Sequence, residues 1–155
     1  MSVRDTAQRQ YIKLLNRTAQ QLHGLSAARE GWIARFRSAL GISGPQLARR
    51  AGVTKAAIYQ AERNEKEGAI SLKQLEKLAD AMGGRLVYAI VPKEGRIEDV
   101  VSEQAHRKAE AIIRRASAHM ALEKQALTSK QLNEEITRLA DELMRDPPPD
   151  FWDDR

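Results

Sequence analysis

Residues 45–63, PQLARRAGVTKAAIYQAER, constrain the fold more than any other stretch of this chain. Two short helical segments are expected to meet at Gly52, because glycine readily adopts the left-handed conformation that ends a helix. Thr54 can then cap the second segment, residues 55–63, with its side-chain oxygen. That segment has few large apolar residues, and its remaining face carries small and polar side chains: Lys55, Ala56, Tyr59 and Gln60. Such a helix packs by a narrow apolar stripe and leaves its other face free for a partner.

The same two segments have the parts of a helix-turn-helix. Inward-facing positions are expected at Leu47, Ala48, Ala51 and Ile58, and Val53 can fill the corner between the helices. A recognition helix that enters a DNA major groove must be slim near its N-terminus and must carry side chains that reach base edges. The second segment fits that description.

Each polar residue of this unit can be given a role in DNA binding. Lys55 can donate to guanine, Gln60 can pair with adenine through two hydrogen bonds, and Ala56 can meet a thymine methyl group. Tyr59 can reach a phosphate or a base edge, and Ser43, Gln46 and Thr54 supply donors that face phosphates. The predicted DNA-binding residues are Ser43, Gln46, Thr54, Lys55, Ala56, Tyr59, Gln60 and Arg63. The alternative is a helical bundle with no role in DNA binding.

The charge distribution favours a polyanion partner for the N-terminal part. Residues 1–92 carry 15 Lys and Arg against 7 Asp and Glu, a balance of +8, whereas residues 93–155 carry 11 against 14, a balance of −3. A solvated basic surface with no partner would have the same composition. Glu65 and Glu67 lie in a loop expected over residues 64–70, and their carboxylates would repel phosphate if they faced DNA.

Other chemistries find no support in the sequence. The chain has no cysteine, which excludes disulfides and thiolate zinc sites. His23, His106 and His119 lack metal-ligand spacing and are expected to be surface or helix-packing residues. There is no phosphate-binding loop, dinucleotide fingerprint or recognisable catalytic set of Ser, His and carboxylate. We therefore expect neither an enzyme nor a metal or cofactor.

Hydropathy predicts a chain that does not enter a membrane. No apolar run approaches the roughly 20 residues of a membrane span, and the start, MSVRDTAQRQ, lacks the apolar core of a signal peptide. The expected location is the cytoplasm, in association with the nucleoid.

Periodicity predicts a mainly α fold in five parts. These are an N-terminal helix and linker (1–31), the helix-turn-helix domain (32–82), one β-strand (83–92), two C-terminal helices (93–145) and an acidic, proline-rich tail (146–155). The strand RLVYAIVP needs a partner for its backbone, and the same strand of a second copy would supply one. This predicts a homodimer with a two-stranded intermolecular ribbon, the alternative being a pairing with some other extended segment.

Residues 32–82 resemble the Xre/Cro-type DNA-binding domain. The resemblance rests on the pattern Gln46-Leu47-Ala48 … Ala51-Gly52-Val53-Thr54 … Ile58 … Glu62. It implies an ion pair between an arginine of the first helix and the glutamate that ends the recognition helix, and Arg37 and Glu62 occupy the matching positions.

A wider pattern resembles the family called mobile mystery protein A. It consists of GWIARFRSALGIS, RLVYAIVPKE, HMALEKQAL and the closing PPPDFWDD. This resemblance implies an antitoxin-like regulator that is encoded beside a Fic-domain protein, a transferase of nucleotide monophosphates. Residues 26–31 also match the inhibitory motif Ser/Thr-x-x-x-Glu-Gly/Asn of Fic regulation through Ser26, Glu30 and Gly31. In that motif the glutamate pairs with a Fic arginine that would otherwise hold the nucleotide γ-phosphate; the alternative is a polar turn between two helices.

These observations predict a sequence-specific transcription regulator that acts as an antitoxin-like autorepressor. A first alternative is a protein that inhibits a Fic-type nucleotidyltransferase, with DNA binding secondary; a second is an RNA-binding or architectural basic protein. The tail has three alternatives: a frayed terminus, a docking segment that places Phe151 and Trp152 in a partner, or a segment whose Asp150, Asp153 and Asp154 fold over the basic face.

Overall fold

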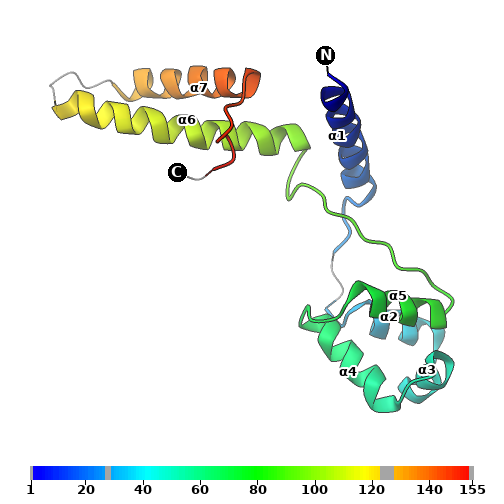
Figure 1. Ribbon diagram of the computed structural model, residues 1–155. Coiled ribbons are helices and arrows are strands. Elements are labelled where there is room, and N and C mark those ends of the chain that lie inside the picture. The colour runs from blue at the N-terminus through cyan, green and yellow to red at the C-terminus, as the bar shows by residue number, and fades with distance from the viewer. Residues whose placement is uncertain (1, 27–28, 123–127, 154–155) are drawn as a thin grey trace. The chain divides into compact units, whose positions relative to one another are not determined.

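The computed structural model describes residues 2–26, 29–122 and 128–153. These residues form helices joined by turns and extended segments, in two compact units, Leu22–Ala89 and Met1–Gln21 with Ile90–Arg155 (Figure 1). The helices are α1 (Val3–Gln21), α2 (Trp32–Leu40), α3 (Gly44–Ala51), α4 (Lys55–Lys66), α5 (Leu72–Ala81), α6 (Ile97–Leu122) and α7 (Ser129–Arg145).

Local side-chain caps explain where several of these helices begin. The Ser43 hydroxyl accepts a hydrogen bond from the backbone N of Gln46, and the backbone N of Ser43 donates to the Gln46 side-chain oxygen. These two bonds form a capping box at the start of α3. Thr128 and Gln131 form the same box at the start of α7. Thr54 and Ser71 accept from backbone N–H groups in the first turns of α4 and α5. The cap at Thr54 is the one that the sequence predicts.

The unit of residues 22–89 is organised around one apolar core. Its buried side chains come from α2, α3, α4 and α5, and they are Ile33, Leu47, Ala48, Ile58, Ala61, Leu78 and Met82. Leu47 of α3 and Ile58 of α4 have no exposed surface, because both are packed in this core. The relative orientation of these two helices is therefore set by packing, and α4 has one face in the core and one outside it.

The predicted β-strand over residues 83–92 is wrong. The structure has no β-strand among the residues it describes, and residues 84–92 form no regular secondary structure. A strand is stable only when a neighbouring backbone pairs with it, and none of the described residues does so. The side chains of Val87, Tyr88 and Ile90 are 69%, 70% and 87% exposed. The pattern of β-branched and aromatic residues carries no information about a pairing partner, so the intermolecular ribbon inferred from it is wrong as well.

In the second unit, α6 and α7 lie side by side as a hairpin (Figure 1). Ala105 and Ala109 of α6 are fully buried against Ile136 and Ala140 of α7, and the small side chains on α6 let the two helices approach closely. The core is completed by Phe151 from the C-terminal segment, which is only 3% exposed. The amide of Gln104 donates to the Phe151 carbonyl at 2.8 Å, and the Lys108 ammonium donates to the Asp150 carbonyl. Phe151 thus packs within its own chain, which none of the three alternatives for the tail included.

In the same unit, α1 is attached to the start of α6 through one asparagine. The Asn16 side chain accepts a hydrogen bond from the backbone N of Ile97 and donates to the Glu98 carboxylate, both at 2.9 Å. Asn16 thereby caps a helix that begins 81 residues later. The hydrogen bond from Asn16 is also the largest cause of the lowered pKa of Glu98.

Candidate nucleic-acid interface

The face of α4 that points away from the core carries the residues expected to contact bases. Ile58 and Ala61 are buried, while Lys55, Ala56, Gln60 and Arg63 are exposed and Tyr59 is half-buried. Residues 56, 60 and 63 are three or four positions apart, so they share one side of the helix. The structure therefore brings these side chains together on one slim surface that protein atoms do not cover.

The predicted phosphate-facing residues lie exposed at the starts of α3 and α4. Ser43 and Gln46 use acceptor atoms in the capping box, with distances of 2.7 and 3.3 Å, and Thr54 Oγ1 accepts from Ala57 N at 3.1 Å. These bonds occupy oxygen lone pairs and leave the hydroxyl protons and the Gln46 amide hydrogens available. Donors of this kind, at helix N-termini that carry a partial positive charge, suit a phosphate.

Gln60 belongs to a short chain of side-chain hydrogen bonds along α4. Its amide nitrogen donates to Asn64 Oδ1 at 2.8 Å, and its oxygen accepts from Arg63 Nη2 at 2.7 Å. Both amide atoms that would pair with adenine are therefore engaged in the unbound protein. The bonds are exposed, so exchange for equivalent bonds to a base is energetically modest. Asn64 was not identified from the sequence, where it was assigned to a loop.

The Tyr59 side chain is held by neighbouring residues, although the sequence predicts that it faces DNA. Its ring packs against the start of α3, where a Cβ atom placed on Gly44 would lie 2.8 Å from the Tyr59 hydroxyl oxygen. The ammonium of Lys55 lies 5.9 Å from the centre of the same ring. Gly44 thus makes room for a tyrosine that supports the lysine beside it, since a cation near an aromatic face is attracted by the ring.

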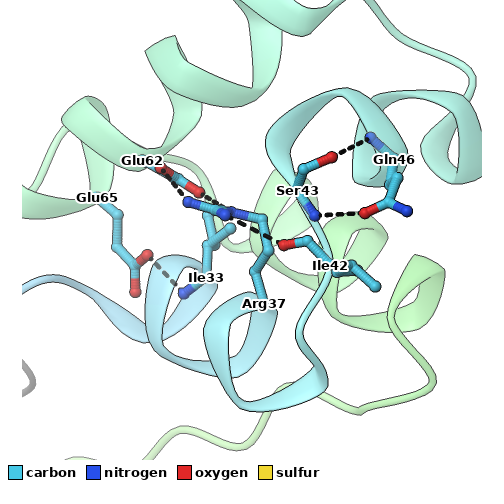
Figure 2. A network of polar contacts seen from close by, with 7 residues as sticks. All are labelled: Ile33, Arg37, Ile42, Ser43, Gln46, Glu62 and Glu65. Atoms are coloured by element: carbon cyan, nitrogen blue, oxygen red, sulfur yellow. Dashed lines mark hydrogen bonds and ion pairs between the residues drawn. The ribbon is translucent and has the colours of Figure 1, made fainter.

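A partly buried ion pair ties α2 to α4. Arg37 Nε donates to Glu62 Oε1 at 2.7 Å, and Arg37 Nη1 donates to the carbonyl of Ile42 at 3.2 Å (Figure 2). The side chains of Arg37 and Glu62 are 19% and 12% exposed. The hydrogen bond to Glu62 raises the pKa of Arg37 above its ordinary value. This is the pair that the family resemblance implies.

Glu65 has a structural role that sequence analysis missed. Because α4 continues to Lys66, Glu65 lies on the helix and not in the loop expected over residues 64–70. Its carboxylate accepts a hydrogen bond from the backbone N of Ile33 at 3.0 Å (Figure 2). It also accepts one from the backbone N of Trp32. A carboxylate there satisfies free N–H groups and complements the helix dipole. Glu65 therefore caps the first turn of α2.

The Ser26–Gly31 motif directly precedes α2, the first helix of the same domain. Ser26 and Glu30 are exposed, whereas residues 27 and 28 lie outside the described part. The Glu30 carboxylate is 3.6 Å from Arg35 Nη2. Gly31 has a φ of +83°, and a Cβ atom there would lie 2.6 Å from Glu65 Oε2. The glycine of the motif is thus needed for the cap on α2, whatever else the motif does.

The unit that contains this surface also carries the excess charge. Residues 22–89 have 11 Lys and Arg against 6 Asp and Glu, a balance of +5, whereas the rest of the chain is balanced. A net positive unit attracts a polyanion over a Debye length of about 10 Å at 0.1 M salt. Among the described residues there is no metal-binding cluster of His, Cys, Asp or Glu. Nor does any helix in the described ranges have the length and apolarity needed to cross a membrane.

Comparison with known proteins identifies the domain. Residues 33–88 match the model of the helix-turn-helix family. Neither the curated proteins nor the solved structures include a significant match to the chain. Residues 33–88 therefore form an Xre/Cro-type helix-turn-helix domain, which indicates a DNA-binding transcription regulator.

Proposed function

We propose that this chain is a sequence-specific repressor that places α4 in the major groove of double-stranded DNA. The observation that carries the proposal is the outer face of α4, where exposed Lys55, Ala56, Gln60 and Arg63 form a slim surface on a helix held rigidly by the core. A helix about 10–12 Å across with its side chains fits a major groove about 12 Å wide.

Phosphate contacts would fix the register of α4. Ser43, Gln46 and Thr54 offer donors at two helix N-termini, and this arrangement orients a DNA strand without reading its sequence. Base readout would then come from Lys55 on guanine and from Gln60 on adenine, after Gln60 exchanges its bonds to Asn64 and Arg63. The Arg37–Glu62 pair and the Glu65 cap would act indirectly, by holding α4 against α2.

We also propose that the protein reads DNA as a homodimer. Four or five side chains on one recognition helix contact only a few base pairs, so a single copy would find many competing sites in a genome. Two copies on a pseudo-palindrome would read half-sites about 34 Å apart, or a multiple of that distance. This proposal does not depend on a strand pairing.

Binding to DNA from upstream of the gene for this protein tests the proposal. Fluorescence anisotropy at two salt concentrations should show tighter binding to that DNA than to a scrambled duplex. Lys55→Ala and Gln60→Ala should each reduce this discrimination by about 1–3 kcal/mol, because each removes one direct base contact. Lys66→Ala, which removes an exposed cation from the far end of α4, is the matched control and should leave discrimination intact. Equal, weak binding to both duplexes would instead favour an RNA-binding or architectural protein.

A second function is proposed for Glu30, that of an antitoxin acting on a Fic-domain toxin. The Glu30 side chain is 63% exposed, and among the described residues its one ion pair is a 3.6 Å contact to Arg35, so it is accessible to an arginine of a partner. The serine and glycine of the motif, Ser26 and Gly31, flank it as in the inhibitory motif. Autorepression and inhibition of a toxin would then reside in one chain.

Co-expression with a neighbouring Fic-domain protein tests this second function. Glu30→Ala should raise nucleotidyl transfer by the complex about tenfold or more, since a charge-assisted hydrogen bond contributes about 1.5–3 kcal/mol. Glu67→Ala, an exposed acid of the same unit, should leave transfer inhibited. Formation of a complex whose activity is insensitive to Glu30 would remove the motif from the mechanism.

A further inference from the structure

Helix α1 carries a row of cations on one side. Its basic residues are Arg4, Arg9, Lys13 and Arg17, against a single acid, Asp5. Arg9, Lys13 and Arg17 are spaced four residues apart and are all exposed, so they form one stripe along the helix. The stripe is about 12 Å long, because each residue advances a helix by 1.5 Å.

Lys13 and Arg17 have no carboxylate three or four residues away on α1, whereas Arg9 follows Asp5 by four residues and helps to lower the pKa of that carboxyl. In α6, Arg107 pairs with Glu103 and Arg114 pairs with Glu110, and in α7, Arg138 pairs with two glutamates. Within the described part of the chain, no ion pair includes a basic residue of α1. A helix that only needed a solvated surface would gain from such pairs, as α6 and α7 do.

The attachment of α1 to α6 leaves this stripe uncovered. Asn16 forms hydrogen bonds with Ile97 and Glu98 at the start of α6, and these bonds attach α1 at this one position. Arg9, Lys13 and Arg17 remain exposed while the anchor is in place. The geometry is therefore that of a supported helix that offers a linear array of positive charge.

We infer that the Arg9–Lys13–Arg17 stripe is a second, sequence-independent DNA contact that binds the phosphate backbone. The inference rests on the proposed function of the helix-turn-helix domain, since that domain brings the DNA. A row of 12 Å faces about three to four phosphates of a strand whose charges repeat every 3.4 Å along the axis. Because both contacts belong to one chain, binding at α4 raises the local phosphate concentration around α1, and affinity increases without any new base contact.

The test is the salt dependence of DNA binding by the full chain and by Arg9→Gln/Lys13→Gln/Arg17→Gln. Each phosphate contact contributes about −0.9 to the slope of log K against log salt concentration, so the slope should become shallower by about 2.7. Between 50 and 200 mM salt, the affinity ratio of wild type to variant should then shrink about 40-fold. Discrimination between upstream and scrambled DNA should not change, because the stripe reads no bases.

A matched variant controls for the loss of three charges. Arg107→Gln/Arg114→Gln/Lys130→Gln removes the same charge from α6 and α7 and should leave the slope nearly unchanged; circular dichroism checks that both variants are folded. An unchanged slope in the α1 variant, or an equal change in both, would overturn the inference while the proposed function stands. Equal binding of the wild type to upstream and scrambled DNA would overturn the proposed function, and the slope difference between the wild type and the α1 variant would then decide the phosphate contact by itself. A membrane surface is a competing partner for the stripe, because Tyr11 and Leu14 of α1 are also exposed. If the wild type binds phosphatidylglycerol vesicles, the α1 variant does not, and both have the same DNA slope, then the partner of the stripe is lipid and not DNA.

Discussion

Glu62→Ala is expected to destabilise the helix-turn-helix domain by about 3 kcal/mol, the lower end of the range for breaking a buried ion pair. The substitution leaves the Arg37 guanidinium mostly buried, with the Ile42 carbonyl as its remaining hydrogen-bond partner among the described residues. For a domain of 60–100 residues, a loss of this size lowers the melting temperature by roughly 12–24 °C. Denaturant unfolding followed by Trp32 fluorescence, in a Trp152→Phe background, reports on this domain alone because the two tryptophans lie in different units.

Two further variants separate the buried charge from the ion pair itself. Arg37→Met/Glu62→Leu replaces both partners by apolar side chains and should restore stability to within about 1.5 kcal/mol of the wild type. Glu30→Ala breaks an exposed pair with Arg35 in the same unit and should change stability by less than about 0.5 kcal/mol. If Glu62→Ala were no more harmful than Glu30→Ala, the Arg37–Glu62 contact would be an ordinary surface pair.

Features encoded over three or four residues were predictable from this sequence. Ser43, Thr54 and Thr128 each cap the helix that follows, because the capping oxygen and the N–H that it accepts are three positions apart. The apolar stripe of α4 was equally local, and it correctly indicated which side of the helix would be free. The candidate site could therefore be placed on α4 before its structure was known.

Contacts between distant residues were not predictable in the same way. Glu65 was expected to repel phosphate from a loop, but it caps α2 through residues more than thirty positions away. A lone carboxylate in a sequence carries no sign of its partner. The Arg37–Glu62 pair, 25 positions apart, was anticipated only through resemblance to a family. The strand over residues 83–92 failed for the same reason, since its composition indicated extended backbone but not what would pair with it.

The C-terminal segment is the other place where a distant contact determines the fold, and Phe151→Ala is expected to show it. Phe151 is only 3% exposed and packs with Ala105, Ala109, Ile136 and Ala140. Removing a buried phenyl ring loses its transfer free energy and leaves a cavity, so the free energy of unfolding should fall by about 3–5 kcal/mol. The loss should appear in calorimetry as a lower transition temperature for the α6–α7 unit, with the helix-turn-helix transition unchanged.

Trp152→Ala is the matched control, because Trp152 is the next residue and is 59% exposed. Its ring touches Phe151 edge-on, with the ring centres 5.1 Å apart, and such a contact contributes only about 0.5–1.5 kcal/mol. A large loss for Phe151→Ala and a small one for Trp152→Ala would establish that the C-terminal segment is part of the core of this unit. Equal, small losses would mean that the C-terminal segment is not packed against α6 and α7 in solution. A buried phenylalanine should contribute more to the core than an exposed tryptophan.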